Sequence, residues 1–480
     1  MLDSAGLTAP TISRLPNWLD PADVDRVEVT GDALRFAVDR PRTDAWPRVG
    51  DGLRRAGAAL KRIRTAELVQ AVDRAARQWC ERDWPPRRRA RDLAAATTGM
   101  SVESVDRSFD VELRNYRAAS LWAALHREFD DPLVLDEPRS TRHFAGRTMA
   151  VGPALVCQAM TGNVPGLPAL GLVRALLVKS AVVMKVASGE PTFAARFAET
   201  LAQVEPRIGD AVLVTYWARD DYVTRDAVLA EADVVIAYGS DEACAALHAA
   251  THARQKFVSH DHKLSVGVLS KEFQRTADPG TLAAEVARDA SMFDQHACIA
   301  PQAYFVEGDL DAVARLGERV ALAMERYAAS CPLGHHDPAA VAGRRMRAVE
   351  AEFHAARALG RRTWAGADWL VTVDDGFAGA DGTGDRALRL VAVPSLDDVL
   401  DQLRPFGTRL QNVAAGVSDG EMPEFAISLA RLGATRLCRP GRMPDPSMAW
   451  RHDGQPRLAE LVRWCDVEMH HWAEPRSEEE

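Results

Sequence analysis

The stretch from residue 150 to about residue 271 constrains the fold more than any other part of the chain. Short, almost unbroken apolar runs, from 181–186 and 234–237 to 264–269, alternate there with helical patterns such as 193–204. Strands of this kind are apolar on both faces because helices cover both sides of the sheet. The pattern therefore predicts an α/β fold with a doubly wound parallel sheet, which binds ligands at the carboxyl ends of its strands.

Patterns outside this stretch divide the chain further. Before it, residues 24–38 predict a β-hairpin, and the sequence then turns helical. After it, strand-like and helical patterns alternate again. We therefore expect three parts: residues 1–271 with the first sheet, residues 272–441 with a second α/β unit, and a C-terminal segment at 442–480.

Composition excludes several classes of protein. The chain has 480 residues, of which 47% are hydrophobic and 26% charged, as is typical of a multi-domain globular protein. Its net charge of −9 argues against a general nucleic-acid binder. The longest apolar stretch, 166–187, contains Arg174, Lys179 and Lys185, so no membrane span is predicted. The N-terminus has no signal-peptide pattern, and we expect a cytoplasmic protein.

The cysteines do not form a regular pattern. There are seven, without a CxxC pair, so neither a disulfide framework nor a metal site is predicted. Cys298 differs from the others because it ends the segment Asp-Gln-His-Ala-Cys, between a helical pattern and a strand-like run. Far upstream, Asn163 follows a predicted strand in Gly-Asn-Val-Pro. A thiol and a side-chain amide suit covalent catalysis in which the amide holds an oxyanion.

Two further segments place polar residues at the ends of predicted strands. Lys185 ends one strand and Ser188 follows it, whereas Gly239 and Ser240 occupy a strand-to-helix turn. The chain has no GxSxG and no GxxxxGK[ST] sequence. These absences argue against an α/β-hydrolase and against a P-loop nucleotide site.

In this order, the segments resemble the aldehyde dehydrogenase superfamily, and within it the bacterial fatty acyl-CoA reductase family associated with luminescence operons. The resemblance covers roughly residues 100–470 and includes the tail sequence His452-Asp453-Gly454, to which we assign no chemical role. It implies a Rossmann-type cofactor domain and an α/β catalytic domain that bears the thiol. The C-terminal segment would then pack on the cofactor domain or take part in oligomerisation.

The resemblance also implies catalytic roles. Cys298 matches the nucleophile of the family, and Asn163 matches the amide that stabilises an oxyanion together with the backbone N–H of Cys298. The structural alternatives are a buried core cysteine and an asparagine that forms a turn. His296, close to the thiol in sequence, would either lower its pKa or have a structural role.

Four residues match cofactor-binding positions of the superfamily. Lys185 would contact the adenosine ribose and any 2′-phosphate, unless it merely reaches water. Ser188 replaces a Glu that NAD-preferring relatives often have, which favours NADPH over NADH; Glu190 would weaken this inference if it took that position. Gly239 and Ser240 would bind the pyrophosphate at a helix N-terminus, unless they form an ordinary turn with a serine cap.

The chain departs from hydrolytic aldehyde dehydrogenases in two places. Residues 257–263 lack the Glu that activates water, and residues 389–394 lack the Glu that often holds the nicotinamide ribose. An enzyme without the first of these is better suited to acyl transfer between thiols than to hydrolysis. We therefore expect NADPH-dependent reduction of an acyl-CoA or acyl-protein thioester to the aldehyde, through an acyl-cysteine on Cys298. A long-chain fatty acyl group is the substrate that the family implies.

Two other functions stay open at this point. One is an aldehyde dehydrogenase that works in the oxidising direction, either hydrolytic or CoA-acylating. The other is a non-catalytic subunit of an acyl-processing complex. The resemblance further implies an acyl-protein synthetase as a partner and a homo-oligomeric assembly.

Overall fold

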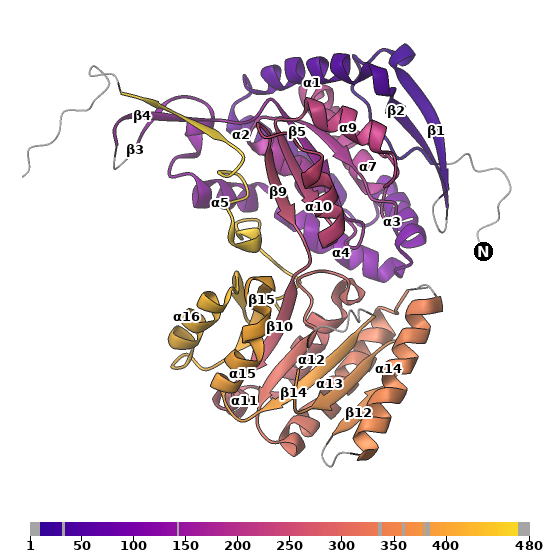
Figure 1. Cartoon of the computed structure of the whole chain (residues 1–480), viewed down its shortest axis with the longest axis vertical. Coiled ribbons are helices and arrows are strands. Elements are labelled where there is room, and N and C mark those ends of the chain that lie inside the picture. Colours follow the sequence, from indigo (N-terminus) through magenta and orange to yellow (C-terminus); the bar gives the residue numbers. More distant parts are fainter. Residues whose placement is uncertain are drawn as a thin grey trace, which may run out of the picture.

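The computed structural model describes residues 10–30, 34–141, 144–334, 338–357, 361–377, 379 and 385–468. Two α/β lobes lie one above the other in Figure 1. The first lobe ends with strand β9 (Lys256–His260), and the second begins with strand β10 (Leu264–Leu269). The C-terminal segment leaves the second lobe and returns to the first.

A five-stranded parallel sheet forms the centre of the first lobe. In spatial order its strands are β7 (Val212–Thr215), β6 (Ala181–Lys185), β5 (Leu155–Ala159), β8 (Val234–Tyr238) and β9. Almost all of the residues in the three central strands are buried, which explains their unbroken apolar sequences. Because the strand that comes first in the chain is central, the connections run to opposite sides, and the predicted doubly wound sheet is confirmed.

Helices and a hairpin surround this sheet. The helices are α1 (Trp46–Leu60), α2 (Thr65–Cys80), α3 (Pro85–Thr98), α4 (Val102–Asn115), α5 (Ala118–Glu128), α6 (Pro168–Leu177), α7 (Phe193–Val204), α8 (Pro206–Asp210), α9 (Tyr222–Glu231) and α10 (Asp241–Ala249). In α2, for example, Leu68, Val72 and Trp79 recur at helical spacing and are buried. The predicted hairpin is confirmed as the antiparallel pair β1 (Val24–Thr30) and β2 (Arg35–Pro41).

The second lobe contains a seven-stranded sheet. In spatial order its strands are β12 (Arg362–Ala365), β13 (Leu370–Asp374), β14 (Ala387–Val393), β11 (Ala303–Glu307), β10, β15 (Leu410–Gly416) and β16 (Arg436–Cys438). Its helices are α11 (Lys271–Thr276), α12 (Pro279–Ser291), α13 (Leu310–Ser330), α14 (Pro338–Arg357), α15 (Leu396–Leu403) and α16 (Met422–Leu432). All pairings are parallel except that of β12 with β13.

The sheet assignment of β10 corrects one prediction. The apolar pattern predicted that residues 264–269 belong to the first sheet. In the structure these residues form β10, which pairs in parallel with β11 and β15 in the second sheet. Its sequence is apolar throughout, and both sheets contain strands of that kind, so composition does not distinguish them. The chain therefore changes sheets between β9 and β10, earlier than the predicted boundary at residue 271.

A small third sheet connects distant parts of the chain. In it, β4 (Phe144–Val151) pairs with β3 (Arg139–Thr141) on one side and with β17 (Arg463–Val467) on the other. Nearby, the backbone N–H groups of residues 457–459 donate to the Glu128 carboxylate at 2.6–2.8 Å. The end of the described chain is thus fastened to the first lobe. No helix within the described residues is long and apolar enough to span a bilayer.

Candidate active site

The structure brings Asn163 and the Cys298 segment together from different lobes. Asn163 follows β5, and Cys298 lies between α12 and β11. The Asn163 Nδ2 donates a hydrogen bond to the backbone carbonyl of His296 at 2.6 Å. Thr161 orients this amide by donating from Oγ1 to Asn163 Oδ1 at 2.8 Å. Since a primary amide has two N–H groups, this contact leaves a second donor close to the thiol segment.

An unusual backbone turn precedes Cys298. Phe293, Asp294 and Gln295 have φ values of 56°, 51° and 65°, so three consecutive non-glycine residues are left-handed. Each such residue costs on the order of 1–3 kcal/mol and persists only where its surroundings hold it. The turn is therefore a strained element whose supports should be visible in the structure.

Gln295 provides one support of this turn. Its Nε2 donates to the carbonyls of Pro301 and Ala387, each at 2.8 Å, and its Oε1 accepts from the Ala387 N–H at 2.7 Å. The side chain is buried, so these three bonds are protected from water. They tie the turn to strand β14 and to the residues that follow Cys298.

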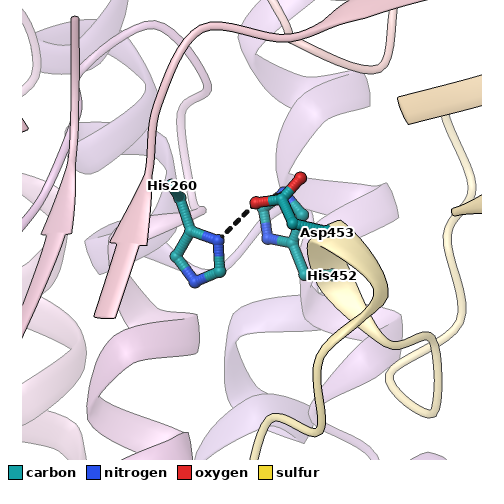
Figure 2. A group of neighbouring side chains, drawn as sticks. All are labelled: His260, His452 and Asp453. Atoms are coloured by element: carbon teal, nitrogen blue, oxygen red, sulfur yellow. Dashed lines mark hydrogen bonds and ion pairs between the residues drawn. The ribbon is translucent and has the colours of Figure 1, made fainter. Parts of the chain in front are cut away.

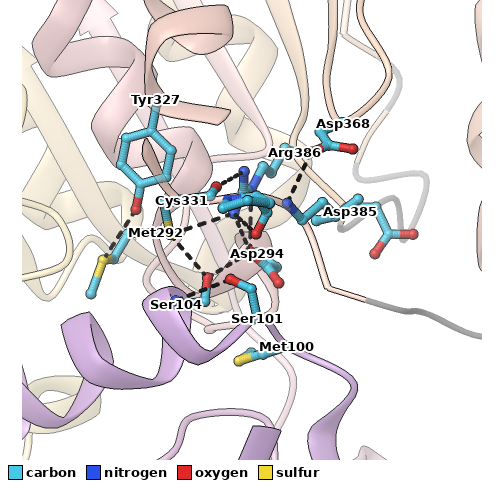
Figure 3. A network of polar contacts seen from close by, with 12 residues as sticks. Met100, Ser101, Ser104, Met292, Asp294, Tyr327, Cys331, Asp368, Asp385 and Arg386 are labelled. Carbon is cyan, nitrogen blue, oxygen red and sulfur yellow. Dashed lines mark hydrogen bonds and ion pairs between the residues drawn. The ribbon is translucent and has the colours of Figure 1, made fainter. Parts of the chain in front are cut away.

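Asp294 provides the second support, which Figure 3 shows. Its carboxylate accepts from Arg386 Nη2 at 2.6 Å and from Ser104 Oγ at 3.0 Å. Arg386 also donates to the carbonyl of Cys331 at 2.7 Å, and both charged residues are almost completely buried. Because Ser104 lies on α4, the bond from its hydroxyl links the first lobe to the thiol segment.

His296 is paired with a carboxylate of the second lobe, Asp385. Its Nε2 lies 3.0 Å from Asp385 Oδ1, and about a third of its side chain is exposed. The Asp385 N–H in turn donates to the carbonyl of Asp294 at 3.0 Å. These contacts favour the structural role among the two that the sequence left open.

Two strands of the second lobe position Cys298 itself. Ser265 Oγ on β10 donates to the Cys298 carbonyl at 2.7 Å, and Asn412 Nδ2 on β15 donates to the Ile299 carbonyl at 3.2 Å. The Cys298 side chain is reached by solvent, in contrast to the buried Cys157 and Cys331. The core-cysteine alternative is therefore not supported.

The thiol is nevertheless surrounded by protein atoms and by a negative charge. This crowding, followed by the charge of Asp453, raises the pKa of Cys298 to about 12. A hydrogen bond from Gln411 and the charge of Arg457 act in the opposite direction. At neutral pH the resting group is consequently a thiol.

Asp453 belongs to a compact polar cluster at the end of β9, which Figure 2 shows. Its Oδ2 lies 2.6 Å from His260 Nδ1, and its Oδ1 accepts from Gln411 Nε2 at 2.6 Å. Burial would raise the pKa of Asp453, but the His260 hydrogen bond and the neighbouring imidazoles outweigh this and hold the pKa far below its usual range. Burial lowers the pKa values of His260 and His452, so both imidazoles are neutral near pH 7.

The spacing of three side chains in this cluster would allow a metal site. One ligand atom each of His260, His452 and Asp453 lies within 4.8 Å of the others. The two imidazole rings, however, are stacked, with centroids 4.4 Å apart and planes 12° from parallel. An imidazole binds a metal ion along a lone pair in its ring plane, and two parallel stacked rings do not direct such lone pairs at one ion. The arrangement fits a hydrogen-bonded cluster better than a metal centre.

Apolar side chains gather on the other side of the thiol segment. One buried apolar cluster includes residues next to both predicted catalytic groups: Val164 beside Asn163, and Ala297 and Ile299 on either side of Cys298. Its other members are Val111, Met292 and Phe293. On the same helix as Val111, the Glu112 carboxylate is buried and accepts from the Tyr116 hydroxyl at 3.3 Å. Burial raises the pKa of Glu112 to about 7.

The predicted cofactor residues lie together at the carboxyl ends of β6 and β8. Lys185 ends β6, and its Nζ lies 5.4 Å from the ring centroid of Tyr216 and 5.9 Å from that of Trp217. Burial lowers the pKa of Lys185. The ammonium is thus partly enclosed by aromatic rings and does not simply extend into water.

Ser188 and Glu190 have different environments. Ser188 is exposed, whereas Glu190 is buried and its Oε1 accepts from the N–H groups of Thr192 and Phe193 at 2.9 Å. Glu190 therefore caps the start of α7. Of these two residues, only Ser188 is exposed.

Gly239 and Ser240 precede α10. Ser240 Oγ accepts from the Ala243 N–H at 3.3 Å, so this residue is the N-cap. A Cβ at Gly239 would lie 3.3 Å from the Ala243 side chain, which is a tight contact. The turn thus has the form of a phosphate-binding helix N-terminus, although its N-cap serine has a structural role as well.

A family model described as acyl-CoA reductase (LuxC) matches residues 60–464. The chain belongs to this family. It is an oxidoreductase that acts on the aldehyde or oxo group, and the family reaction is the reduction of an acyl thioester to an aldehyde. The resemblance to the acyl-CoA reductases that the motifs indicated is confirmed.

Similar proteins and structures agree with this assignment. The chain is 23% identical to long-chain acyl-protein thioester reductase 2 of Photobacterium leiognathi. The match extends over 351 residues and covers 70% of each of the two chains. It is 26% identical over 347 residues to the long-chain acyl-protein thioester reductase of Aliivibrio fischeri, covering 70% of this chain and 68% of that one. Among solved structures, an oxidoreductase from Marinobacter aquaeolei matches with a TM-score of 0.73 at 14% identity, over 97% of this chain and 100% of that one. Aldehyde dehydrogenase 21 from Physcomitrella patens matches with a TM-score of 0.72 at 13% identity, over 96% and 98%.

The likeness to these solved structures confirms the aldehyde dehydrogenase-like fold of the chain. The sequence indicated Cys298 and Asn163, whose segments the structure brings together, but it did not indicate Gln411 or His260 and suggested no role for their partner Asp453. The His-Asp-Gly sequence in the tail could have indicated a turn, because Asp and Gly both tolerate left-handed backbone. Asp453 has a φ of 55° and is followed by Gly454, which is left-handed as well. Nothing around Gln411 in the sequence distinguishes it from other strand residues.

Proposed function

We propose that this acyl-CoA reductase forms a covalent acyl-cysteine on Cys298 and uses NADPH to reduce it. The observation that supports the proposal is the hydrogen bond of 2.6 Å from Asn163 Nδ2 to the His296 carbonyl, because it joins this amide, from the first lobe, to the segment that carries Cys298. This is the arrangement that acyl transfer with oxyanion stabilisation requires.

In the first step, the Cys298 sulfur bonds to the acyl carbon and the bond from that carbon to the donor sulfur breaks. The proton that Cys298 loses leaves with the donor thiol. The oxyanion that forms in between is stabilised by the free N–H of Asn163 and by the backbone at Cys298. Because the resting group is a thiol, proton transfer is part of this step and not complete before it.

For the second step, the residues proposed below would hold a nicotinamide cofactor, which would supply a hydride to the acyl carbon. The resulting oxyanion collapses, the bond to the Cys298 sulfur breaks, and the aldehyde leaves. The sulfur then takes a proton from solvent. Asn163 stabilises this oxyanion too, so we expect Asn163→Ala to lower kcat by about 10²–10³-fold.

We propose that Lys185, Ser188, Gly239 and Ser240 hold the nucleotide. The tight turn at Gly239 and the enclosed ammonium of Lys185 fit a dinucleotide, and the exposed Ser188 leaves room for a 2′-phosphate. Ser188→Glu should therefore raise KM for NADPH at least about tenfold, because a carboxylate repels the phosphate, while KM for NADH changes little. Ser188→Gln is the matched uncharged control.

The acyl group that we propose is a long fatty acyl chain, carried by CoA or by a partner acyl-protein synthetase. The buried apolar cluster around Val164 and Ile299 supports an apolar chain. The names of the relatives from Photobacterium leiognathi and Aliivibrio fischeri, which specify long-chain acyl-protein thioesters, support the same class.

One experiment tests the central claim. The full-length protein is incubated with a series of acyl-CoAs and, separately, with an acylated synthetase, and the Cys298 peptide is analysed by mass spectrometry before and after NADPH is added. We expect acyl mass on Cys298 and aldehyde release. Cys298→Ser should lose both, whereas Cys465→Ser, a change at another exposed cysteine, should retain both. Unmodified Cys298 with every donor would overturn the proposal, and aldehyde-dependent reduction of NADP⁺ alone would favour the oxidising direction.

A further inference from the structure

One buried face of helix α4 contacts both the segment that follows Asn163 and the segment that leads to Cys298. Ser104, Ser108 and Val111 follow one another at spacings of four and three residues, so they lie on the same side of the helix. All three are buried. Since the hydroxyl of a buried serine needs a hydrogen-bond partner, the partners of Ser104 and Ser108 show what this face holds.

The middle of the helix holds the segment that follows Asn163. Ser108 Oγ donates to the carbonyl of Pro165 at 2.6 Å. The next residue, Gly166, has a φ of 93°, and a Cβ at this position would lie 3.2 Å from the Cβ of Glu112. The backbone of this segment therefore lies directly against α4, and a residue larger than glycine would force the two apart.

The start of the helix holds the strained turn before the thiol. Ser104 Oγ donates to the Asp294 carboxylate at 3.0 Å, as Figure 3 shows. Val111 adds an apolar contact, because it belongs to one buried cluster with Phe293 of the turn and Val164 of the other segment. One helix face thus contacts both segments, although they belong to different lobes.

Helix α4 is itself anchored in both lobes. In the first lobe, the buried Arg87 donates from Nη2 to Asp110 of α4 at 2.7 Å and from Nη1 to the Trp79 carbonyl at 2.8 Å. Toward the second lobe, Arg107 of α4 donates to Ser330 Oγ at 3.0 Å. These bonds restrain the helix, so the two serines hold their partners from a fixed support.

We propose that Ser104 and Ser108 are positioning residues that keep the Asn163 amide and the Cys298 sulfur at the separation that acyl transfer requires. Ser108 acts on the amide through the Pro165 carbonyl, and Ser104 acts on the sulfur through the Asp294 turn. A displacement of about 1 Å between reacting groups can cost about 10²-fold in rate. The inference rests on the proposed function, in which Asn163 and Cys298 act together.

The test measures kcat and KM for the reduction of a long-chain acyl-CoA by NADPH with full-length variants. Ser108→Ala should lower kcat about tenfold and change KM for the acyl-CoA less than about twofold, because a displaced amide weakens oxyanion stabilisation and not substrate binding. Ser104→Ala should lower kcat by a similar factor. Ser120→Ala is the matched control and should retain the wild-type values, because its hydroxyl donates to the Arg114 carbonyl, outside both segments.

Combination with Asn163→Ala separates positioning from a general loss of structure. In that background Ser108→Ala should change kcat less than about twofold, because the amide that Ser108 positions is already gone. Ser104→Ala should still lower kcat about tenfold there, because it acts through the thiol segment. Ser108→Cys keeps a side chain of similar shape with a weaker donor, and it gives a second variant if Ser108→Ala does not fold.

This pattern would support the two positioning roles. The roles are overturned if Ser108→Ala lowers kcat by the same factor with and without Asn163, or if either serine variant keeps the wild-type kcat. The variant at position 163 distinguishes this failure from that of the proposed function. If Asn163→Ala alone keeps the wild-type kcat, the proposed function fails and the positioning roles fail with it.

Discussion

Two carboxylates of the second lobe and the C-terminal segment, Asp294 and Asp453, differ in their ion-pair partners. Asp294 forms an ion pair with the Arg386 guanidinium at 2.6 Å, which neutralises its charge. Asp453 faces neutral imidazoles and keeps its charge. The Asp294 carboxylate, held by Arg386 and Ser104, therefore helps to fix the shape of the thiol segment. The Asp453 carboxylate is held instead by the His260 imidazole and the Gln411 amide. The counter-charge of a carboxylate in the protein interior thus decides whether its charge is neutralised.

The largest expected effect comes from breaking the neutralised pair. Arg386→Met leaves Asp294 charged, buried and without its cation, which should lower the free energy of unfolding by about 3–5 kcal/mol. Urea denaturation followed by circular dichroism measures this. Arg404→Met, which breaks an exposed pair with Asp401, is the control and should cost less than about 1 kcal/mol. Similar costs for the two variants would contradict the role assigned to Arg386.

The other support of the turn should give a smaller effect. Gln295→Met removes three buried hydrogen bonds to the backbone and should cost about 2–3 kcal/mol, because the groups left behind are cut off from water. Thermal unfolding of this variant and of Gln203→Met, at an exposed glutamine, gives the comparison. A loss no greater than that of the exposed control would show that the left-handed turn does not depend on Gln295.

The second cluster predicts a pH dependence. His452 and His260 have lowered pKa values in the folded protein, so the unfolded chain binds protons that the folded chain excludes. Their contribution to stability is fully present above pH ~6.5 and is lost as the pH falls, by up to about 1.4 kcal/mol per pH unit for each histidine. In His452→Gln the slope of stability against pH should be smaller than in the wild type. His252→Gln, at an exposed histidine, should retain the wild-type slope.

The smallest expected effect is a coupling close to zero between the two carboxylates. No hydrogen-bond or ion-pair partner is common to Asp294 and Asp453 in the contacts described above. The stability changes of Asp294→Asn and Asp453→Asn should therefore add within about 0.5 kcal/mol in the double variant. A coupling above about 1 kcal/mol would mean that the two clusters act as one unit.

Much of the fold could be predicted from local pattern. The central strands of the first sheet have the unbroken apolar sequences that burial on both faces requires, and the predicted hairpin forms an antiparallel pair. The motifs around Asn163 and Cys298 identified the family for the same reason, since each is a local segment at the end of an element. Lys185 and Ser188 also lie at a strand end, but their cofactor roles remain predictions.

What the sequence alone determined, then, is the order of the elements, the fold class and the family, because these follow from residues that are neighbours in the chain. Only the tertiary structure decided that β10 belongs to the second sheet and that Asp294 is held by Arg386 and Ser104. Strand pairing and charge contacts join residues that are far apart in sequence, and no local pattern records which partners they find. The thiol segment could thus be recognised from its neighbours in the chain, whereas the groups that hold it in shape could be recognised only from its neighbours in space.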